Sequence, residues 1–204
     1  MSKTGQEIEA KFYLSNADKM RTRLHALQAR LIQARLLERN LRFDLPDRSL
    51  SSAGRVLRLR QDSAARLTYK GASQNREGVL ARQEIEMIVE EFEKARQFLE
   101  ALGYRKTLYY EKYRTTFELD QALVMLDEMP YGNFVEVEGA SVEQIQAVSG
   151  RLGLNWAAAT GTSYSALFQN IRKTLELPFY DITFADFEGI NVTPGDLSVA
   201  PADE

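Results

Sequence analysis

Charged and apolar residues alternate along several short stretches of this chain, and the first stretch is Glu7-Ile8-Glu9-Ala10-Lys11. Successive side chains of a β-strand face opposite ways, so Glu7, Glu9 and Lys11 would share one face of a strand. Three charges on one face are costly to bury and ordinary when solvated. The fold therefore depends on whether the other strands leave this face in water or enclose it.

The same period of two recurs down the chain and predicts seven further strands, at about 32–45, 55–61, 66–70, 79–89, 104–119, 123–129 and 133–139. Helical spacing of apolar residues predicts helices near 17–30, 90–102, 142–152 and 162–175. Asn16 is the expected N-cap of the first helix. The polar stretch 71–78 is typical of a mobile loop.

One face of each predicted strand is charged, and the opposite face is apolar enough to pack against helices. The acids of this face are Glu7, Glu9, Glu84, Glu86, Asp127, Glu136 and Glu138, and the bases are Lys11, Arg58, Arg60, Lys70, Arg82, Lys112 and Arg114. An open antiparallel sheet with one wet face would explain any single strand. Because charges rather than neutral polar residues recur, we favour an α+β fold in which the sheet is closed or nearly closed on itself, with its helices packed outside and its charges pointing into a polar lumen.

Composition narrows the chemistry that such a tunnel could perform. The net charge of −3 argues against nucleic acid as a partner, and the absence of cysteine excludes disulfides and thiolate sites. The single histidine, His25, lies in a predicted helix and is expected at the surface, which disfavours histidine-based catalysis. No apolar run is long enough to span a membrane, so we expect a cytoplasmic protein without a membrane partner.

Charges that point into an enclosed space need partners of opposite sign. Clustered carboxylates without His or Cys suit hard cations such as Mg²⁺ or Mn²⁺, and converging Arg and Lys side chains suit phosphate oxygens. The combination predicts a metal–polyphosphate complex as the ligand. Phosphoryl or nucleotidyl transfer could then proceed by positioning and charge neutralisation alone.

The ordered set of motifs resembles one family. The pentad Glu7-x-Glu9-x-Lys11 is similar to the signature that opens the CYTH superfamily, the triphosphate tunnel metalloenzymes. Further segments follow in the family's order over about residues 7–140: Leu57-Arg58-Leu59-Arg60, Leu67-Thr68-Tyr69-Lys70, Glu84-x-Glu86, Glu111-Lys112-x-Arg114, Asp127 and Val135-Glu136-Val137-Glu138-Gly139. Ser163-Tyr164-x-x-Leu167 also resembles a C-terminal element of the cyclase-like branch.

This resemblance implies a closed or nearly closed eight-stranded antiparallel β-barrel, a tunnel that binds a triphosphate. It also implies roles for individual residues. Those expected to bind phosphate are Lys11, Arg58, Arg60, Lys70, Arg82, Lys112 and Arg114, and among them Lys11, Lys70 and Arg114 are the candidate catalytic residues. Those expected to bind Mg²⁺ or Mn²⁺ are Glu7, Glu9, Glu136 and Glu138, with Asp127 and Glu86 as weaker candidates. For every acid, a structural ion pair across the lumen is the alternative.

The family includes class IV adenylyl cyclases, thiamine triphosphatases and inorganic triphosphatases, so more than one reaction is open. We favour metal-dependent hydrolysis of a triphosphate: tripolyphosphate, thiamine triphosphate or a nucleoside triphosphate. The alternative is a cyclase that makes cyclic AMP and pyrophosphate from ATP. A third is a polyphosphate- or nucleotide-binding module without turnover. No segment reads as a dedicated adenine pocket, and no histidine lies near residues 42–46, which favours hydrolysis.

Domain organisation is simple in this interpretation. Residues 1–177 are predicted to form the tunnel domain together with its C-terminal helices, as a monomer or a homodimer. Residues 178–204 form an acidic tail without Lys or Arg, and we expect it to be partly disordered over its last ten residues.

Overall fold

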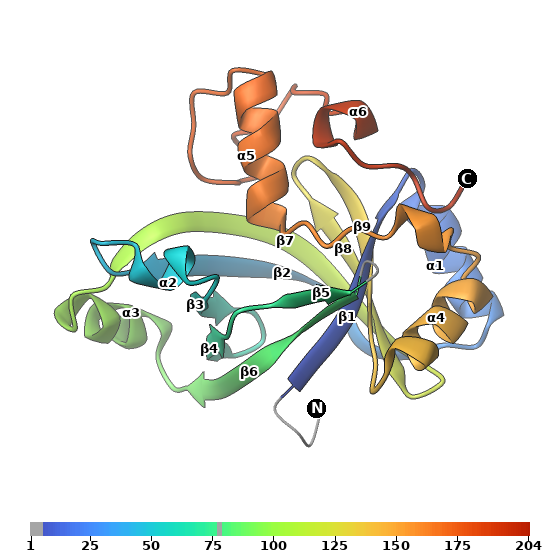
Figure 1. The fold of residues 1–204 in the computed structure, drawn as a ribbon, viewed down its shortest axis with the longest axis horizontal. Coiled ribbons are helices and arrows are strands. Elements are labelled where there is room, and N and C mark those ends of the chain that lie inside the picture. The colour runs from blue at the N-terminus through green and yellow to red at the C-terminus, as the bar shows by residue number, and fades with distance from the viewer. Residues whose placement is uncertain (1–5, 77–78) are drawn as a thin grey trace.

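Eight antiparallel strands form a closed barrel in the computed structural model, which describes residues 6–76 and 79–204 (Figure 1). Around the ring the order is β1-β9-β8-β7-β2-β3-β4-β6, and pairing of β1 with β6 closes it. The strands are β1 (Gln6–Leu14), β2 (Arg30–Asp44), β3 (Val56–Gln61), β4 (Ala65–Lys70), β6 (Val79–Val89), β7 (Arg105–Leu119), β8 (Ala122–Met129) and β9 (Gly132–Glu138). The predicted closed α+β barrel is confirmed, and the open sheet is not what forms.

A ninth strand, β5 (Gln74–Arg76), lies where a loop was expected. It continues the line of β4 along β6, and the Gly71 amide donates to the Gln83 carbonyl at 2.9 Å between the two pieces. The loop prediction is wrong for this part because main-chain pairing with β6 satisfies the backbone in spite of the polar sequence. Residues 77–78 of the expected loop lie outside the described residues.

The helices cover the outside of the barrel, as expected (Figure 1). They are α1 (Ala17–Ala26), α2 (Ser49–Ser52), α3 (Phe92–Ala101), α4 (Val142–Arg151), α5 (Tyr164–Thr174) and α6 (Pro194–Leu197), with the 3₁₀-helix η1 (Trp156–Ala158). Asn16 caps α1 by accepting from the Lys19 amide at 2.8 Å. This helix stops earlier than the predicted residue 30, because Gln28 adopts a φ of 56° and turns the chain into β2.

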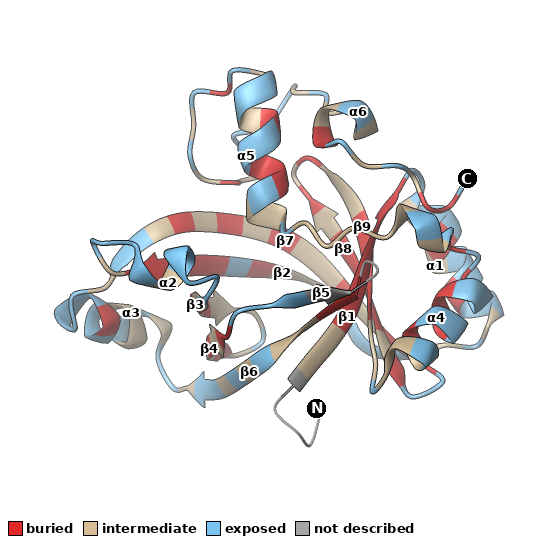
Figure 2. Cartoon of the chain, viewed as in Figure 1, coloured by how far each residue is buried: buried red, intermediate tan, exposed pale blue. Residues whose placement is uncertain are grey.

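Hydrophobic packing lies between the barrel wall and these helices, and within the described residues it forms three clusters (Figure 2). Leu24 of α1 and Ile145 of α4 pack on Phe12 and Val137 of the wall. Leu99 of α3 packs on Leu59 of β3. The third cluster joins α5 to the C-terminal segment. The apolar face of each strand therefore points outward, and its charged face is left to point inward.

The C-terminal tail, whose last ten residues we expected to be disordered, makes specific contacts with β1 and with the start of α1 in the structure. The Ala202 amide donates to the Tyr13 carbonyl at 3.0 Å, and Ala202 is fully buried. The Asp203 carboxylate accepts from the Ser15 and Asn16 amides at 2.8 and 2.9 Å. Composition misled here, because a tail without cations can still be fixed by backbone hydrogen bonds and by a carboxylate at the start of α1.

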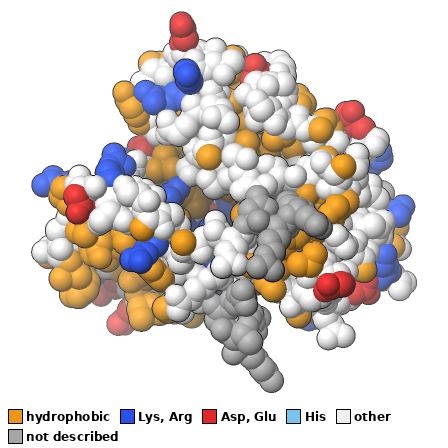
Figure 3. Space-filling view, in the orientation of Figure 1, with side chains coloured by type: hydrophobic (Ala, Val, Ile, Leu, Met, Phe, Trp, Pro, Cys, Tyr) orange, Lys and Arg blue, Asp and Glu red, His pale blue; other side chains and the backbone are white. Residues whose placement is uncertain are grey.

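Exposed apolar side chains gather where α3 and β6 lie, on the left of the molecule in the space-filling view (Figure 3). They include Ile85 and Met87 of β6 and Phe98 and Leu102 of α3. Among the described residues, no helix combines the length and the apolar character needed to cross a membrane.

Candidate active site

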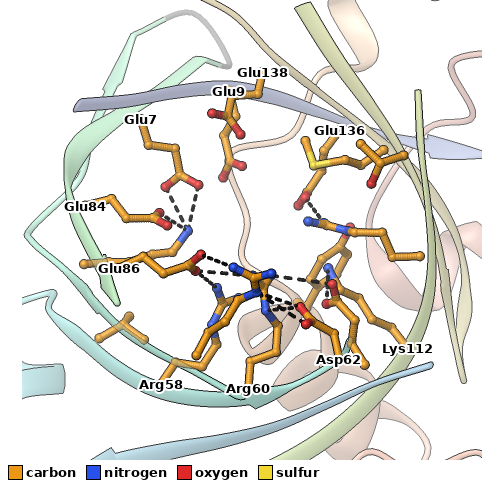
Figure 4. Close-up of a pocket in the computed structure, with 18 of the residues that line it drawn as sticks. Glu7, Glu9, Arg58, Arg60, Asp62, Glu84, Glu86, Lys112, Glu136 and Glu138 are labelled. Atoms are coloured by element: carbon orange, nitrogen blue, oxygen red, sulfur yellow. Dashed lines mark hydrogen bonds and ion pairs between the residues drawn. The ribbon is translucent and has the colours of Figure 1, made fainter. Parts of the chain in front are cut away.

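The barrel encloses a cavity of about 380 Å³ that is lined mainly by charge (Figure 4). Among the described residues, nine basic side chains reach it: Lys11, Arg42, Arg58, Arg60, Arg66, Lys70, Arg82, Lys112 and Arg114. Eight acidic side chains also reach it: Glu7, Glu9, Glu38, Asp62, Glu84, Glu86, Glu136 and Glu138. All seven predicted phosphate-binding residues and five of the six predicted metal-binding residues therefore line one space.

Strand register brings the first and last strands of the barrel into one acidic wall. Glu9 lies directly opposite Glu138, and Lys11 lies opposite Glu136, in the antiparallel pairing of β1 with β9. Lys11 contacts Glu136 at 3.2 Å, and the two side chains are only 5% and 7% exposed. The period of two that was visible in the sequence thus places both Glu-x-Glu pairs on the inner face.

Glu7 is held by two cations from β4 and β6. Lys70 Nζ donates to both Glu7 oxygens at 2.7 and 2.9 Å, and Arg82 Nε donates at 2.8 Å. Burial alone would raise the pKa of Glu7, but the positive charges of Lys70 and Arg82 outweigh it and lower the pKa to about 2. Lys70 also contacts Glu84 at 2.7 Å. Glu7 is therefore ionised in the folded protein.

Glu9 and Glu138 experience the opposite electrostatic environment. Burial and the negative charges of Glu136 and Glu7 raise the pKa of Glu9. Burial and the charges of Glu7, Glu9 and Glu84 raise the pKa of Glu138 to about 7. In Figure 4 both side chains point into the cavity from the wall above it. This end of the cavity carries more negative charge than its own cations compensate.

Arg58 and Arg60 of β3 form the opposite wall, and Glu86 lies beside them (Figure 4). Arg60 contacts Glu38 at 3.5 Å and Glu86 at 3.3 Å, and Glu86 accepts from the Thr68 hydroxyl at 3.0 Å. Lys112 and the arginines outweigh the burial of Glu38 and lower its pKa to about 2. Burial and the nearby Arg58 lower the pKa of Arg60, which indicates a local crowding of positive charge suited to an anion.

Asp127 anchors two cations that line the cavity, and it is not itself among the lining residues. Its carboxylate accepts from Lys112 at 2.7 Å, from Arg114 Nε at 2.6 Å and from the Tyr164 hydroxyl at 2.8 Å, and its side chain is 0% exposed. Arg114 reaches on to Glu136. With its oxygens occupied in this way, Asp127 is a poor candidate for the predicted metal ligand and a good one for fixing Lys112 and Arg114.

The start of α5 contributes to the cavity from outside the barrel. Tyr164 places its ring 4.1 Å from Lys11 Nζ and 5.2 Å from Lys112 Nζ. Lys11 also donates to the Thr162 carbonyl at 3.4 Å, and Arg42 donates to the Ser165 hydroxyl at 2.5 Å. The barrel strands and the start of α5, which are distant in sequence, therefore line the same cavity.

Sequence reasoning missed several lining residues, namely Glu38, Arg42, Asp62, Arg66 and the residues at the start of α5. For Glu38 and Arg42 a signal existed, because they alternate along a strand that was predicted but whose faces were not assigned. For Tyr164 the resemblance of Ser163-Tyr164-x-x-Leu167 to a family element was a signal, but it did not place the residue in the cavity, because that depends on how α5 packs on the barrel.

The acidic side chains are oxygen donors of the kind that hard divalent cations prefer. Within the described residues, however, no three carboxylates converge closely enough to ligate an ion as they stand. The excess negative charge around Glu9 and Glu138 fits a cation chemically, and the side chains would have to draw together to hold it.

Comparison with known proteins identifies the family of this chain. A family model described as the CYTH domain matches residues 5–149. The chain belongs to the CYTH family. The adenylate cyclase CyaB of Aeromonas hydrophila is 28% identical over 174 residues, which cover 79% of this chain and 87% of that protein.

Solved structures share the fold. A candidate adenylate cyclase from Vibrio parahaemolyticus superposes with a TM-score of 0.73 at 20% identity, covering 81% of this chain and 99% of that one. A candidate adenylyl cyclase from Hippeastrum, described as having a dominant triphosphatase activity, gives a TM-score of 0.62 at 19% identity, covering 80% and 95%. At these identities the likeness shows the CYTH tunnel fold alone.

Proposed function

We propose that this protein hydrolyses a triphosphate inside the barrel with the help of a divalent cation. The observation that carries the proposal is the separation of charge across one cavity. Glu7, Glu9 and Glu138 face it from β1 and β9, while Arg58 and Arg60 face it from β3. A simple anion site would not need buried carboxylates with raised pKa values. In a metal–triphosphate complex, the cation would bring positive charge to the carboxylates and the phosphates would bring negative charge to the arginines.

Mg²⁺ or Mn²⁺ would be held by Glu7, Glu9, Glu136 and Glu138, and it would supply a Lewis acid beside the phosphate oxygens. We leave Asp127 out of this set because Lys112, Arg114 and Tyr164 occupy its oxygens. We leave Glu86 out because it lies among arginines, with Arg60 at 3.3 Å and Arg66 at 3.5 Å.

The basic residues would bind and orient the phosphates. Arg58, Arg60 and Lys112 face the cavity, so they can neutralise the charge that builds up on the leaving diphosphate. Lys11, Lys70 and Arg114 contact both the acidic wall and the cavity, and they would hold the terminal phosphate near the attacking water. Water attacks the terminal phosphorus, the bridging P–O bond breaks, and orthophosphate and a diphosphate leave.

A second candidate is cyclisation of ATP to cyclic AMP and pyrophosphate. The similarity to the Aeromonas hydrophila adenylate cyclase favours it. The same charges would serve both reactions, which differ in whether the α- or the terminal phosphorus meets the nucleophile. The triphosphatase activity described for the Hippeastrum structure favours hydrolysis.

The test is a panel of tripolyphosphate, thiamine triphosphate and ATP, each with Mg²⁺ or Mn²⁺ and each repeated with a chelator. Orthophosphate, pyrophosphate and cyclic AMP are measured together. We expect cation-dependent orthophosphate release from at least one substrate. Formation of cyclic AMP with equimolar pyrophosphate would contradict the hydrolase proposal. Tight binding of a triphosphate without turnover would identify a binding module.

A further inference from the structure

The C-terminal segment, residues 178–203, lies beyond the part of the chain that matches the family model and contacts the barrel at both of its ends. At its start, the Ile182 amide donates to the Tyr109 carbonyl at 2.9 Å, and the Ile182 carbonyl accepts from the Glu111 amide at 2.8 Å. At its end, Ala202 and Asp203 bond to β1 and to the start of α1. In Figure 1 this segment runs beside α5, forms α6 and then reaches α1.

Between these two anchors, the segment packs on α5 through aromatic rings. Phe187 is 5% exposed, and its ring centroid lies 6.2 Å from Phe168 of α5 and 5.9 Å from Tyr131 in the β8–β9 turn. Phe179 lies 5.2 Å from Phe187 and 6.2 Å from Phe168. The Phe187 ring is therefore the point at which the tail contacts both α5 and the barrel. We call this contact the joint.

This joint is connected to the cavity by a short series of contacts. The Tyr131 hydroxyl donates to the Tyr164 main-chain carbonyl at 2.9 Å, which fixes the first residue of α5. The Tyr164 hydroxyl donates to Asp127 at 2.8 Å, and Asp127 holds Lys112 and Arg114. Phe187 is therefore linked to Lys112 and Arg114 through successive contacts of Tyr131, Tyr164 and Asp127.

We propose that residues 178–203 are a positioning element of the active site: they hold α5 where Tyr164 and Ser165 can fix the basic residues of the cavity. The role assigned to the cavity rests on the proposed function. Phe187 and Tyr131 are not among the residues that line the cavity, so they are positioning residues and not catalytic ones. A 1 Å displacement of a site residue can cost about two orders of magnitude in rate, which makes such support effective.

The experiment uses the full chain and compares four variants with the wild type. Phe187→Ala removes the joint, and Phe187→Leu partly refills it. Tyr131→Phe keeps the ring and removes only the hydroxyl that reaches Tyr164. Phe98→Ala is the matched control, because Phe98 is 64% exposed on α3.

Two quantities are measured: the dissociation constant of inorganic tripolyphosphate with Mg²⁺, and amide hydrogen exchange over residues 162–167. We expect Phe187→Ala to raise both the dissociation constant and the exchange rate by about tenfold, with Phe187→Leu in between. Tyr131→Phe should shift both in the same direction while its unfolding midpoint stays near that of the wild type. Phe98→Ala should leave both unchanged.

A folded Phe187→Ala protein with wild-type exchange over residues 162–167 overturns the inference. If that variant does not fold, Phe187→Leu and Tyr131→Phe decide the question, and wild-type values in both overturn it. Failure of the wild type to bind tripolyphosphate would count against the proposed function instead. The exchange measurement needs no ligand, so it judges the positioning role separately.

Discussion

Glu9 lies directly opposite Glu138 across the β1–β9 pair, and both carboxyl groups are directed into the same cavity. Like charges opposite each other in a ladder destabilise a sheet. The fold nevertheless keeps this pair, and burial together with Glu7, Glu9 and Glu84 raises the pKa of Glu138 to about 7. The pair therefore costs stability and, in our account, is kept because a divalent cation binds there.

The first prediction concerns the pH dependence of stability without a cation. Between the ordinary glutamate pKa of 4.5 and about 7, the folded protein keeps the Glu138 proton that the unfolded chain has released. The contribution of Glu138 to the free energy of unfolding is therefore full below pH 4.5 and falls as pH rises towards 7, by up to about 3 kcal/mol. Urea unfolding in chelator, compared between wild type and Glu138→Gln, measures it. Parallel pH profiles would contradict it.

The second prediction concerns cation affinity. Glu9→Gln and Glu138→Gln should each weaken Mn²⁺ binding by about tenfold or more. Removal of a metal ligand lowers metal affinity at least as much as removal of a group that only hydrogen-bonds to a ligand. The same variants should be more stable than the wild type at pH 8 without metal, because a repulsion is gone. Glu93→Gln, on the exposed face of α3, is the control. Unchanged Mn²⁺ titrations in both variants would remove Glu9 and Glu138 from the proposed site.

The third prediction concerns the basic wall. Arg58→Ala should lower kcat by about 10²–10³-fold, because it removes a donor aimed at the charge that develops on the phosphates. Arg96→Ala is the matched control, since Arg96 pairs at the surface of α3 with Glu93 and Glu100. Circular dichroism should show the same secondary structure in both variants. An Arg58→Ala enzyme with near wild-type kcat would show that this wall does not bind the reacting phosphates.

The fourth prediction concerns acid stability. Glu38, whose pKa is lowered to about 2, contributes stability that is present above pH 4.5 and is lost as pH falls towards 2. Glu38→Gln removes one of the carboxylates that neutralise Arg60 and Lys112, so we expect a loss of up to about 3 kcal/mol at pH 7. The difference between the two proteins in denaturant unfolding should shrink below pH 4. A constant difference down to pH 2 would mean that the charge of Glu38 is not what matters.

The charged faces of the barrel could be predicted from the sequence because strand alternation is local. The face on which a strand residue lies follows from the character of the residues two positions before and after it. This rule places Glu7, Glu9, Arg58 and Arg60 on the charged inner face. Asp127 lies on the same inner face, but whether it meets a cation, a metal or solvent depends on side chains from β7 and α5. Its position behind Lys112 and Arg114 could not be read from spacing.

The parts that were missed depend on contacts between distant segments. Tyr164 reaches the cavity because α5 packs on the barrel, and no periodicity within α5 encodes that. The ordered tail was missed because its composition resembles that of a disordered segment, although Ile182 and Ala202 are fully buried. In the same way, β5 forms by pairing with β6 in spite of its polar sequence.

The most direct test of the central claim is hydrolysis in ¹⁸O-labelled water with Mg²⁺, using ATP and tripolyphosphate and analysing every product. We predict that the label enters orthophosphate, because water attacks the terminal phosphorus, and that Arg58→Ala and a chelator each suppress the reaction. Unlabelled pyrophosphate formed together with cyclic AMP would contradict hydrolysis and identify the protein as a cyclase.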